Sequence, residues 1–244
     1  MLNQNKLGFL PSNKRGEVIM KRTLVYLGCN EGRGVDRLLQ RYSFDTVLLV
    51  EGDPISFSVL KDRFGENPNI TLVNSCLVPE AGVSSIEFYR TGNFVSSSIL
   101  ALPDDGSAKA YGGLREVVNL PAAFLPEILD NSKIDVVNFL VSDLQGADFL
   151  ILKSLRRYLM EGRIHEIFIE THKRDNILYK GSRNSFREHR ELLKEMYKVN
   201  YFSHDGKILG TAEDLVEFFA EDAYEEVDVH WSLRAGRAPE YLWS

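Results

Sequence analysis

Glycines and an acid follow the first two apolar runs of the chain, and residues of these types can hold a nucleoside. A glycine-rich turn that contains Gly28, Asn30 and Gly32 follows the first run, and Glu51 follows the second. Glycine lets the backbone approach a ligand closely, and a helix that begins after such a turn has an N-terminus that favours negative charge. A carboxylate at the position of Glu51 can accept both hydroxyls of a ribose. The turn and the acid together predict a site for a nucleoside-containing cofactor.

Three later apolar runs are also followed by residues that can do chemistry. Ser75 and Cys76 come at the third run, Asp143 after the fourth, and Glu170 and His172 after the fifth. Ligands of open α/β sheets bind beyond the carboxyl ends of the parallel strands. Asp143, Glu170 and His172 can therefore converge as candidate acid–base residues. The same set could hold a divalent ion, although nothing in its spacing requires a metal.

The elements that must position these residues alternate along the chain. Apolar runs without polar alternation are typical of parallel strands buried on both faces. We therefore expect an α/β fold with a Rossmann-like, doubly wound, mostly parallel sheet of seven principal strands and helices on both faces. One of the last two strands can be antiparallel. The seven principal strands are expected at 23–27, 46–50, 70–78, 134–141, 164–169, 199–202 and 227–233, and two further strands at 84–89 and 116–120. The expected helices are 35–42, 54–64, 121–129, 149–159, 185–197 and 212–219.

The domain organisation is simple. Residues 1–22 are expected to be an N-terminal extension and residues 23–244 a single domain, because no repeat or linker divides them. The segment 92–113 is rich in serine, glycine and aspartate and predicts a long loop. Such a loop can close over a site as a lid, or it can be a surface loop without that role.

The composition excludes several classes of protein. Apolar residues make up 44% and charged residues 26% of the chain, as in globular and not in disordered proteins. No run reaches the roughly 18–20 apolar residues of a membrane span, and residues 1–22 lack the apolar centre of a secretion signal. The two cysteines, Cys29 and Cys76, cannot form a disulfide framework or a zinc site by themselves. We therefore expect a cytoplasmic protein that does not bind membranes.

Two cofactors compete for the predicted nucleoside site. The spacing of Gly28, Gly32 and Gly34 matches the glycine pattern of short-chain dehydrogenases, which use a nicotinamide cofactor. That chemistry usually needs a tyrosine four residues before a lysine, and none of the ten tyrosines has this partner. The Gly-x-Gly-x-x-Gly fingerprint of dinucleotide sites is also missing from the turn. S-adenosyl-L-methionine is therefore the favoured cofactor, and an NAD-dependent oxidoreductase stays as a weaker alternative.

Several segments carry a resemblance to a known family. The most distinctive is Asp143-x-Gln145-Gly146-Ala147-Asp148, and the other matching segments are 25–32, 49–54, 117–121, 137–142 and 152–153. The chain resembles the FkbM-type family of methyltransferases that depend on S-adenosyl-L-methionine. The resemblance covers well over half of the chain. It implies transfer of a methyl group to an oxygen nucleophile, commonly a hydroxyl of a sugar or another natural product.

The resemblance also implies roles for the cofactor residues. Glu51 would hold the ribose, and Ser75 and Cys76 would lie at the adenine edge. Gly28 and Gly32 would line the methionine half. Asn30 would lie near the amino or carboxylate group of that half.

On the acceptor side, the expectations concern acids and bases. Asp143 would position or deprotonate the acceptor and would also contact the cofactor, with His172 as the second catalytic candidate and Glu170 beside them. Arg183 and Arg187 follow the fifth strand and would suit an acceptor that carries a phosphate or carboxylate, unless they belong to a solvated helix face. With 29 basic and 35 acidic residues, a net charge of −6, we expect a small acceptor and no nucleic acid.

Three positions depart from the family pattern. The chain has Tyr26 where the family usually has aspartate, Val141 where it has lysine, and Pro121 where it has aspartate. These departures leave a second hypothesis open, namely a non-catalytic module that binds S-adenosyl-L-methionine or a nucleotide. The sequence predicts no oligomeric state.

Overall fold

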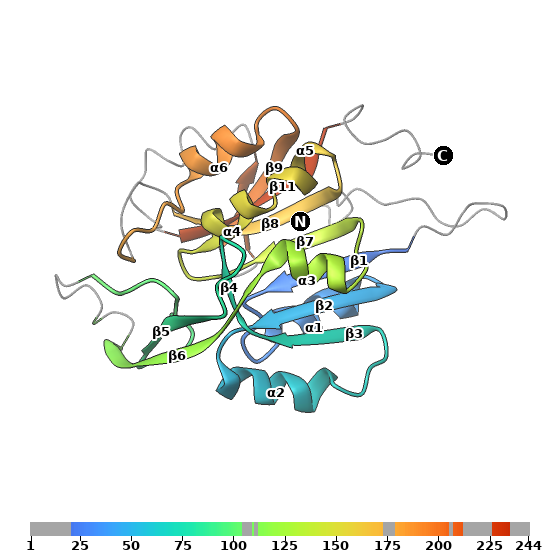
Figure 1. Ribbon diagram of the computed structural model, residues 1–244. Coiled ribbons are helices and arrows are strands. Elements are labelled where there is room, and N and C mark those ends of the chain that lie inside the picture. The colour runs from blue at the N-terminus through green and yellow to red at the C-terminus, as the bar shows by residue number, and fades with distance from the viewer. Residues whose placement is uncertain are drawn as a thin grey trace.

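The computed structural model describes residues 21–103, 109, 112–172, 179–204, 207–211 and 226–234 of the chain. Within these residues the backbone forms one large sheet, one small sheet and six helices (Figure 1). The predicted helix 212–219 and residues 1–20 of the predicted extension lie outside the described residues. The predicted lid loop 92–113 is described only in part.

The large sheet has eight strands in the order β10-β9-β11-β8-β7-β1-β2-β3 (Figure 1). From β8 to β3 each neighbouring pair is parallel, whereas β11 is antiparallel to both β8 and β9, and β10 is antiparallel to β9. The predicted α/β class is confirmed, and the sheet is mixed because of these last strands. The strands are β1 (Thr23–Leu27), β2 (Thr46–Glu51), β3 (Ile70–Asn74), β7 (Val137–Ser142), β8 (Ile164–His172), β9 (Tyr197–His204), β10 (Lys207–Thr211) and β11 (Glu226–Leu233).

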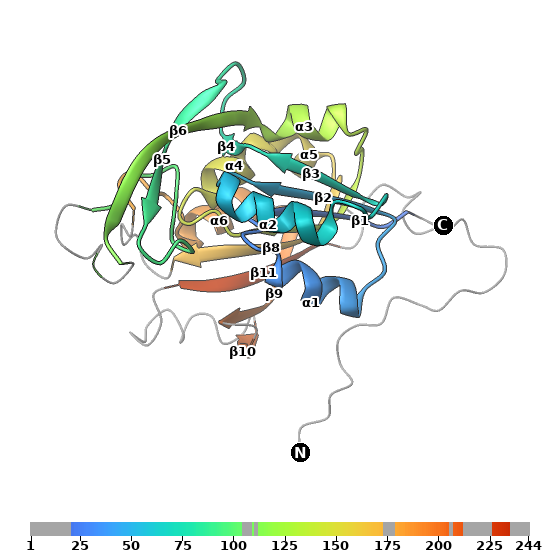
Figure 2. The same ribbon diagram turned by 90° about the horizontal axis from the view of Figure 1, so that it is seen from below.

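Helices cover both faces of this sheet (Figure 2). One face packs against α1 (Arg33–Arg41) and α2 (Pro54–Phe64), with Val35 and Leu60 fully buried between them and the strands. The other face packs against α3, α4, α5 and α6, and buried side chains of these helices and of the strands form the larger apolar cluster. None of the described helices has the length and apolar character that crossing a membrane requires. The bounds of these four helices are Leu125–Asn131, Asp148–Ser154, Arg156–Met160 and Phe186–Leu193.

A small three-stranded sheet in the order β4-β6-β5 stands beside the large one. It contains β4 (Cys76–Val78), β5 (Ser85–Thr91) and β6 (Leu114–Phe124). The predicted single strand 70–78 is therefore wrong, because the chain leaves the large sheet at Ser75 and pairs with β6 from Cys76 onward. This change of sheet places the two sheets on either side of the residues that follow β2.

Other expected boundaries also shift, and each shift follows from a distant pairing. The strand expected at 116–120 is longer, since β5 pairs with β6 along its length, so Pro121 lies in a strand and not in a helix. The helix expected at 149–159 is divided at Leu155 into α4 and α5. The strand expected at 164–169 continues to His172 because β11 pairs with it through Glu170 and His172. Glu170 and His172 therefore lie within β8 and not beyond its end.

Candidate functional site

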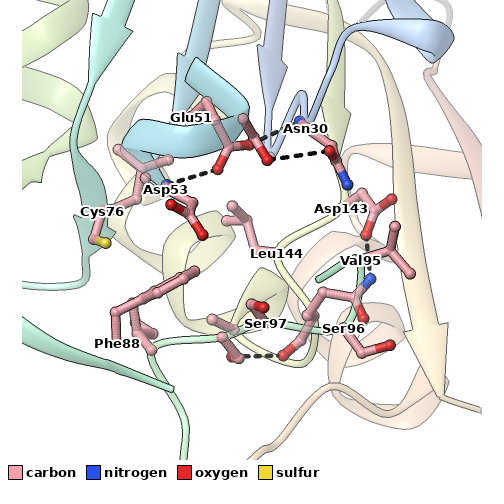
Figure 3. Close-up of a pocket in the computed structure, with 18 of the residues that line it drawn as sticks. Asn30, Glu51, Asp53, Cys76, Phe88, Val95, Ser96, Ser97, Asp143 and Leu144 are labelled. Atoms are coloured by element: carbon pink, nitrogen blue, oxygen red, sulfur yellow. Dashed lines mark hydrogen bonds between the residues drawn. The ribbon is translucent and has the colours of Figure 1, made fainter. Parts of the chain in front are cut away.

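A cavity of about 370 Å³ lies at the carboxyl ends of β1, β2 and β7 (Figure 3). Gly28, Glu51 and Asp143, which follow or end these strands, line it together with the segment 94–99. The place is where open α/β sheets bind ligands, and the volume falls in the range of about 300–1,000 Å³ typical of small-molecule sites. The cavity is therefore the candidate functional site.

Glu51 is the last residue of β2, and two backbone groups hold its carboxylate. Its Oε2 accepts a hydrogen bond from the Asn30 N–H at 2.7 Å, and its Oε1 accepts one from the Asp53 N–H at 2.8 Å. The side chain lines the cavity but is only 8% exposed. Burial raises the pKa of Glu51 to about 7, although both backbone N–H groups favour the charged form. A carboxylate accepts about four hydrogen bonds, so each oxygen retains capacity for a donor in the cavity.

The residues of the glycine turn after β1 lie in two places, the cavity wall and the packing against α2. Gly28 has a φ of +71° and lines the cavity, and a Cβ added to it would overlap the carbonyl oxygen of Asp143. Asn30 also lines the cavity, and its Oδ1 accepts hydrogen bonds from the Glu31 N–H and the Ser56 hydroxyl. Gly32 lies outside the cavity wall, where an added Cβ would meet the ring of Phe64 at 2.5 Å. The structure thus brings Gly28 and Asn30 to the site and places Gly32 in the packing against α2.

The same glycine turn makes room for Tyr26, the residue that stands where the family usually has aspartate. It lies in β1, does not line the cavity, and packs into the cluster beneath α1 and α2. A Cβ added to Gly34 would overlap the Tyr26 hydroxyl, so the glycine leaves room for that group. Burial raises the pKa of Tyr26 above its usual value, with the nearby charge of Asp143 adding to the effect.

Ser75 and Cys76 lie at the junction between the two sheets, and both line the cavity. The Ser75 N–H donates to the Glu51 carbonyl oxygen at 3.1 Å. Cys76 packs with Phe88 in an apolar cluster, and both form the wall next to Glu51 (Figure 3). Burial raises the pKa of Cys76 to about 12, so its thiol stays neutral.

Asp143 and Glu170 are joined by Gln145, which the sequence indicates only as part of a motif. The Gln145 side-chain amide donates to Asp143 Oδ1 at 2.6 Å and lies 3.3 Å from Glu170 Oε1. Asp143 and Gln145 line the cavity, whereas Glu170 is buried behind them. Burial raises the pKa of both acids, and the neighbouring charge of Asp143 raises that of Glu170 further.

Asp148, the last residue of the same motif, is fully buried and holds the turn after β7. Its Oδ1 accepts hydrogen bonds from the Ser142 hydroxyl at 2.6 Å and from the Leu144 N–H at 2.9 Å. Burial raises the pKa of Asp148 to about 7. Because Asp143 lies between Ser142 and Leu144, these bonds fix the backbone that carries it.

Residues 92–103 belong to the described part of the predicted loop 92–113. They include one wall of the cavity, and hydrogen bonds connect this wall to Gln145. The Ser98 hydroxyl donates to the Gln145 carbonyl oxygen at 2.8 Å. The Tyr179 hydroxyl lies 2.9 Å from Gln145 Oε1 and 3.2 Å from the Ser96 carbonyl oxygen. The Lys180 N–H donates to the Ala101 carbonyl oxygen at 2.7 Å. The loop is thus positioned over the site by contacts from a segment far along the chain.

The other predicted residues lie away from the cavity. His172 is buried in β8, and burial lowers its pKa to about 4. Arg183 is largely exposed, where its Nε donates to Glu188 at 2.6 Å, and Arg187 on α6 is exposed. None of the three lines the cavity. Within the part of the chain that the structure describes, no three His, Cys, Asp or Glu side chains are grouped so that they could hold a metal ion.

Asp53 and Arg90 form a buried ion pair beside Glu51 that sequence reasoning missed. Arg90 on β5 donates from Nε to Asp53 Oδ2 at 2.9 Å and from Nη2 to Asp53 Oδ1 at 2.7 Å. Asp53 lines the cavity and also accepts from the Ile55 N–H, as a cap of α2. The Asp53-Pro54 pair signals a helix start, but no local pattern connects it with an arginine 37 residues later.

Comparison with known proteins agrees with this geometry. The family model described as the methyltransferase FkbM domain matches residues 33–201, which is more than half of the chain. The fold is similar to that of an FkbM methyltransferase from Methylobacillus flagellatus KT, with a TM-score of 0.50 and 16% identity, over 86% of this chain. This chain spans only 43% of the length of that protein.

A second solved structure is more distant. Fibrillarin from Aeropyrum pernix, solved with natively bound S-adenosyl-L-methionine, is 13% identical, with a TM-score of 0.45, over 86% of this chain and 67% of its own. No curated protein sequence matches the chain. The match of the family model confirms the resemblance seen in the sequence, and S-adenosyl-L-methionine is the methyl donor of that family. The chain belongs to the FkbM family of S-adenosyl-L-methionine-dependent methyltransferases.

Proposed function

We propose that this chain binds S-adenosyl-L-methionine in the cavity and methylates a hydroxyl group of a small, sugar-like or natural-product acceptor. The observation that carries the proposal is the Glu51 carboxylate. It is buried at the end of β2, each oxygen accepts one backbone N–H, and it faces the cavity with acceptor capacity left on both oxygens. The two hydroxyls of a ribose are donors that match this arrangement.

The remaining walls fit the other parts of the cofactor. Cys76 and Phe88 provide an apolar wall beside Glu51, which suits the face of an adenine ring, with Ser75 at its edge. Gly28 provides a wall without a side chain, and Asn30 provides polar atoms for the amino or carboxylate group of the methionine half.

Asp143 is the group that we propose to receive the proton of the acceptor hydroxyl. The cofactor supplies an electrophilic methyl group on a sulfonium sulfur. Asp143 lines the cavity, and the Gln145 amide holds its carboxylate in one orientation. The acceptor oxygen would form a bond to the methyl carbon while the methyl–sulfur bond breaks, which leaves S-adenosylhomocysteine as the thioether product. The hydroxyl proton would pass to Asp143, and Glu170 behind Gln145 would keep the amide in place. The loop wall at 94–99 excludes water and helps to align the acceptor.

The serine, amide and acid side chains of the cavity suit a hydroxylated acceptor. Ser96, Ser97 and Ser98 line the cavity, and their hydroxyl oxygens can accept hydrogen bonds from a polyol. The two arginines expected to bind an anionic group do not line the cavity, so the proposal does not rely on an anionic acceptor.

Equilibrium binding tests the cofactor part of the proposal. We would titrate S-adenosylhomocysteine and NAD into the wild type, Glu51→Gln and Glu31→Gln, using calorimetry. Glu31 is a matched control because it lies in the same turn, is partly exposed and does not line the cavity. We expect Glu51→Gln to weaken S-adenosylhomocysteine binding by about tenfold to a hundredfold, since a hydrogen bond to a charged group contributes roughly 1.5–3 kcal/mol. Binding of NAD alone, or equal affinity in Glu51→Gln and the wild type, would contradict the proposal.

Turnover separates an enzyme from a non-catalytic module. S-adenosylhomocysteine release is measured with a panel of sugars and glycosylated natural products, for the wild type and Asp143→Asn. We expect an acceptor-dependent release that Asp143→Asn lowers by about 10²-fold or more, while its S-adenosylhomocysteine affinity stays within about threefold of the wild type. Undiminished release in Asp143→Asn would remove Asp143 from the mechanism.

A further inference from the structure

Arg90 occupies an unusual place for an arginine that does not line the cavity. It lies on β5 of the small sheet with its side chain 10% exposed, and it uses all three nitrogens in ion pairs. Two of these contacts form a fork on the Asp53 carboxylate, and the third, from Nη1, reaches Glu116 at 2.8 Å on the neighbouring strand. A forked pair of this kind fixes orientation as well as charge.

Asp53 passes this constraint to Glu51. The Asp53 backbone N–H donates to Glu51 Oε1 at 2.8 Å, and its side chain caps α2 through the Ile55 N–H at 3.0 Å. Asp53 is therefore held from three directions. Arg90 and the first turn of α2 hold its side chain, and Glu51 holds its backbone N–H. Figure 3 shows Asp53 and Glu51 side by side at the cavity wall.

The charge of Arg90 also matters for Glu51. Asp53 is 4% exposed and Glu51 is 8% exposed, so two carboxylates share a poorly solvated wall. Among the described residues, the other titratable groups in the cavity wall are Asp143, Cys76 and Glu226, and Cys29 is buried near Glu51. None of these four is cationic. Removing Arg90 would leave the Asp53 charge buried and unpaired, which disfavours a second charge beside it.

We infer that Arg90 is a positioning residue for the cofactor: through Asp53 it holds the Glu51 carboxylate in place, and it balances the Asp53 charge beside Glu51, without touching the ligand. The inference rests on the proposed function, since it concerns the same ribose site. It gives the small sheet a role in cofactor binding in addition to packing, because β5 supplies Arg90 and β6 supplies Glu116, the second acid that pairs with it.

The test measures affinity and its pH dependence by calorimetry. S-adenosylhomocysteine is titrated near neutral pH, and 5′-methylthioadenosine, which has both ribose hydroxyls but no amino-acid group, is titrated across roughly pH 5.5–8.5. The matched control is Arg163→Gln. Arg163 is 16% exposed and, like Arg90, pairs with two acids, Asp135 and Glu161, but it lies outside the cavity wall.

We expect Arg90→Gln to weaken S-adenosylhomocysteine binding by about tenfold and to raise the midpoint of the pH profile by about one unit. Asp53→Asn alone should lower the midpoint of the pH profile. Arg90 then keeps its positive charge without the negative charge of Asp53, which favours the ionised form of Glu51. The double variant, Arg90→Gln with Asp53→Asn, should return the midpoint to the wild-type value. Arg163→Gln should change neither affinity nor midpoint.

Two results would overturn the inference. The first is a loss of affinity in Arg90→Gln no larger than in Arg163→Gln, and the second is a loss without a shift of the pH midpoint. If Arg90→Gln does not fold, Arg90→Lys decides, because it keeps the charge and loses the fork: weaker binding with an unshifted midpoint supports the inference, and wild-type affinity contradicts it. A wild-type protein that binds neither ligand would instead contradict the proposed function.

Discussion

Gly28 lies close to the backbone of Asp143, and substituting it gives a prediction with a defined size. Gly28→Ala forces a side chain onto a residue with a φ of +71°, which costs about 1–2 kcal/mol in the left-handed region. The added Cβ also overlaps the carbonyl oxygen of Asp143, and such overpacking costs a further 1–3 kcal/mol or so. We therefore expect the free energy of unfolding to fall by about 2–5 kcal/mol.

Gly82→Ala separates these two contributions. Gly82 has a φ of +82° but nothing within 4 Å of an added Cβ, so only the backbone contribution of about 1–2 kcal/mol should remain. Urea denaturation of both variants and the wild type gives the values, and calorimetry with S-adenosylhomocysteine gives the affinities. Gly28→Ala should also lose about tenfold or more in affinity because Asp143 must move. Equal destabilisation of the two variants, or unchanged affinity in Gly28→Ala, would refute the close approach of the turn to the end of β7.

Three further predictions concern the surroundings of the site. Because burial raises the pKa of Glu51 to about 7, the folded state holds this proton more tightly than the unfolded chain. Wild-type stability should thus fall by up to ~3 kcal/mol through this group as pH rises from about 4.5 to about 7. Glu51→Gln has no group that titrates at this position, so its free energy of unfolding should not show this fall. If urea denaturation gives a difference between the wild type and Glu51→Gln that does not change with pH, the raised pKa is contradicted. Gly34→Ala should destabilise the fold by about 1–3 kcal/mol, and adding Tyr26→Phe should recover at least half of the loss; additive losses in thermal unfolding would argue against the contact. Tyr179→Phe should increase amide hydrogen exchange in residues 96–101. The control Tyr197→Phe loses a hydrogen bond to the Ile164 carbonyl oxygen instead and should not change exchange in these residues. Equal protection of residues 96–101 in both variants would mean that Tyr179 does not hold the loop.

The parts of the fold that local signals determine could be predicted from the sequence. The helix over 54–64 was predicted with the bounds that the structure has, because Asp53 caps it and Pro54 suits its first turn. The strands at 23–27 and 46–51 are short apolar runs buried on both faces, which a sequence pattern indicates well. The position of Glu51 followed from the second of these strands and that of Asp143 from the apolar run 134–141, and the structure places both residues at the cavity.

The parts that depend on distant partners could not be predicted. Nothing near Ser75 indicates that the chain changes sheet there, since the partner of β4 is a strand some forty residues later. The extension of β8 through Glu170 and His172 likewise depends on β11. The placement of these two residues beyond a strand end was therefore wrong, while their predicted chemical roles stay predictions.

Side-chain partners across long separations form the second unpredictable class. The pairing of Arg90 with Asp53 joins two sheets, and the contact of Tyr179 with Gln145 joins a late loop to the floor of the cavity. Arg183 was assigned to the acceptor because it follows the fifth strand, but it is exposed and pairs with Glu188 away from the cavity. Charge along a sequence does not tell which side of an element faces a site.

The central claim is that the Glu51 carboxylate holds the ribose of the cofactor, and a crystal structure of the complex with S-adenosylhomocysteine tests it most directly. We predict that both ribose hydroxyls lie about 2.5–3.0 Å from the Glu51 oxygens, with the Asn30 and Asp53 N–H bonds to that carboxylate retained. The adenine should lie against Cys76 and Phe88. A ribose bound elsewhere, or a Glu51 side chain turned away from the nucleoside, would contradict the account.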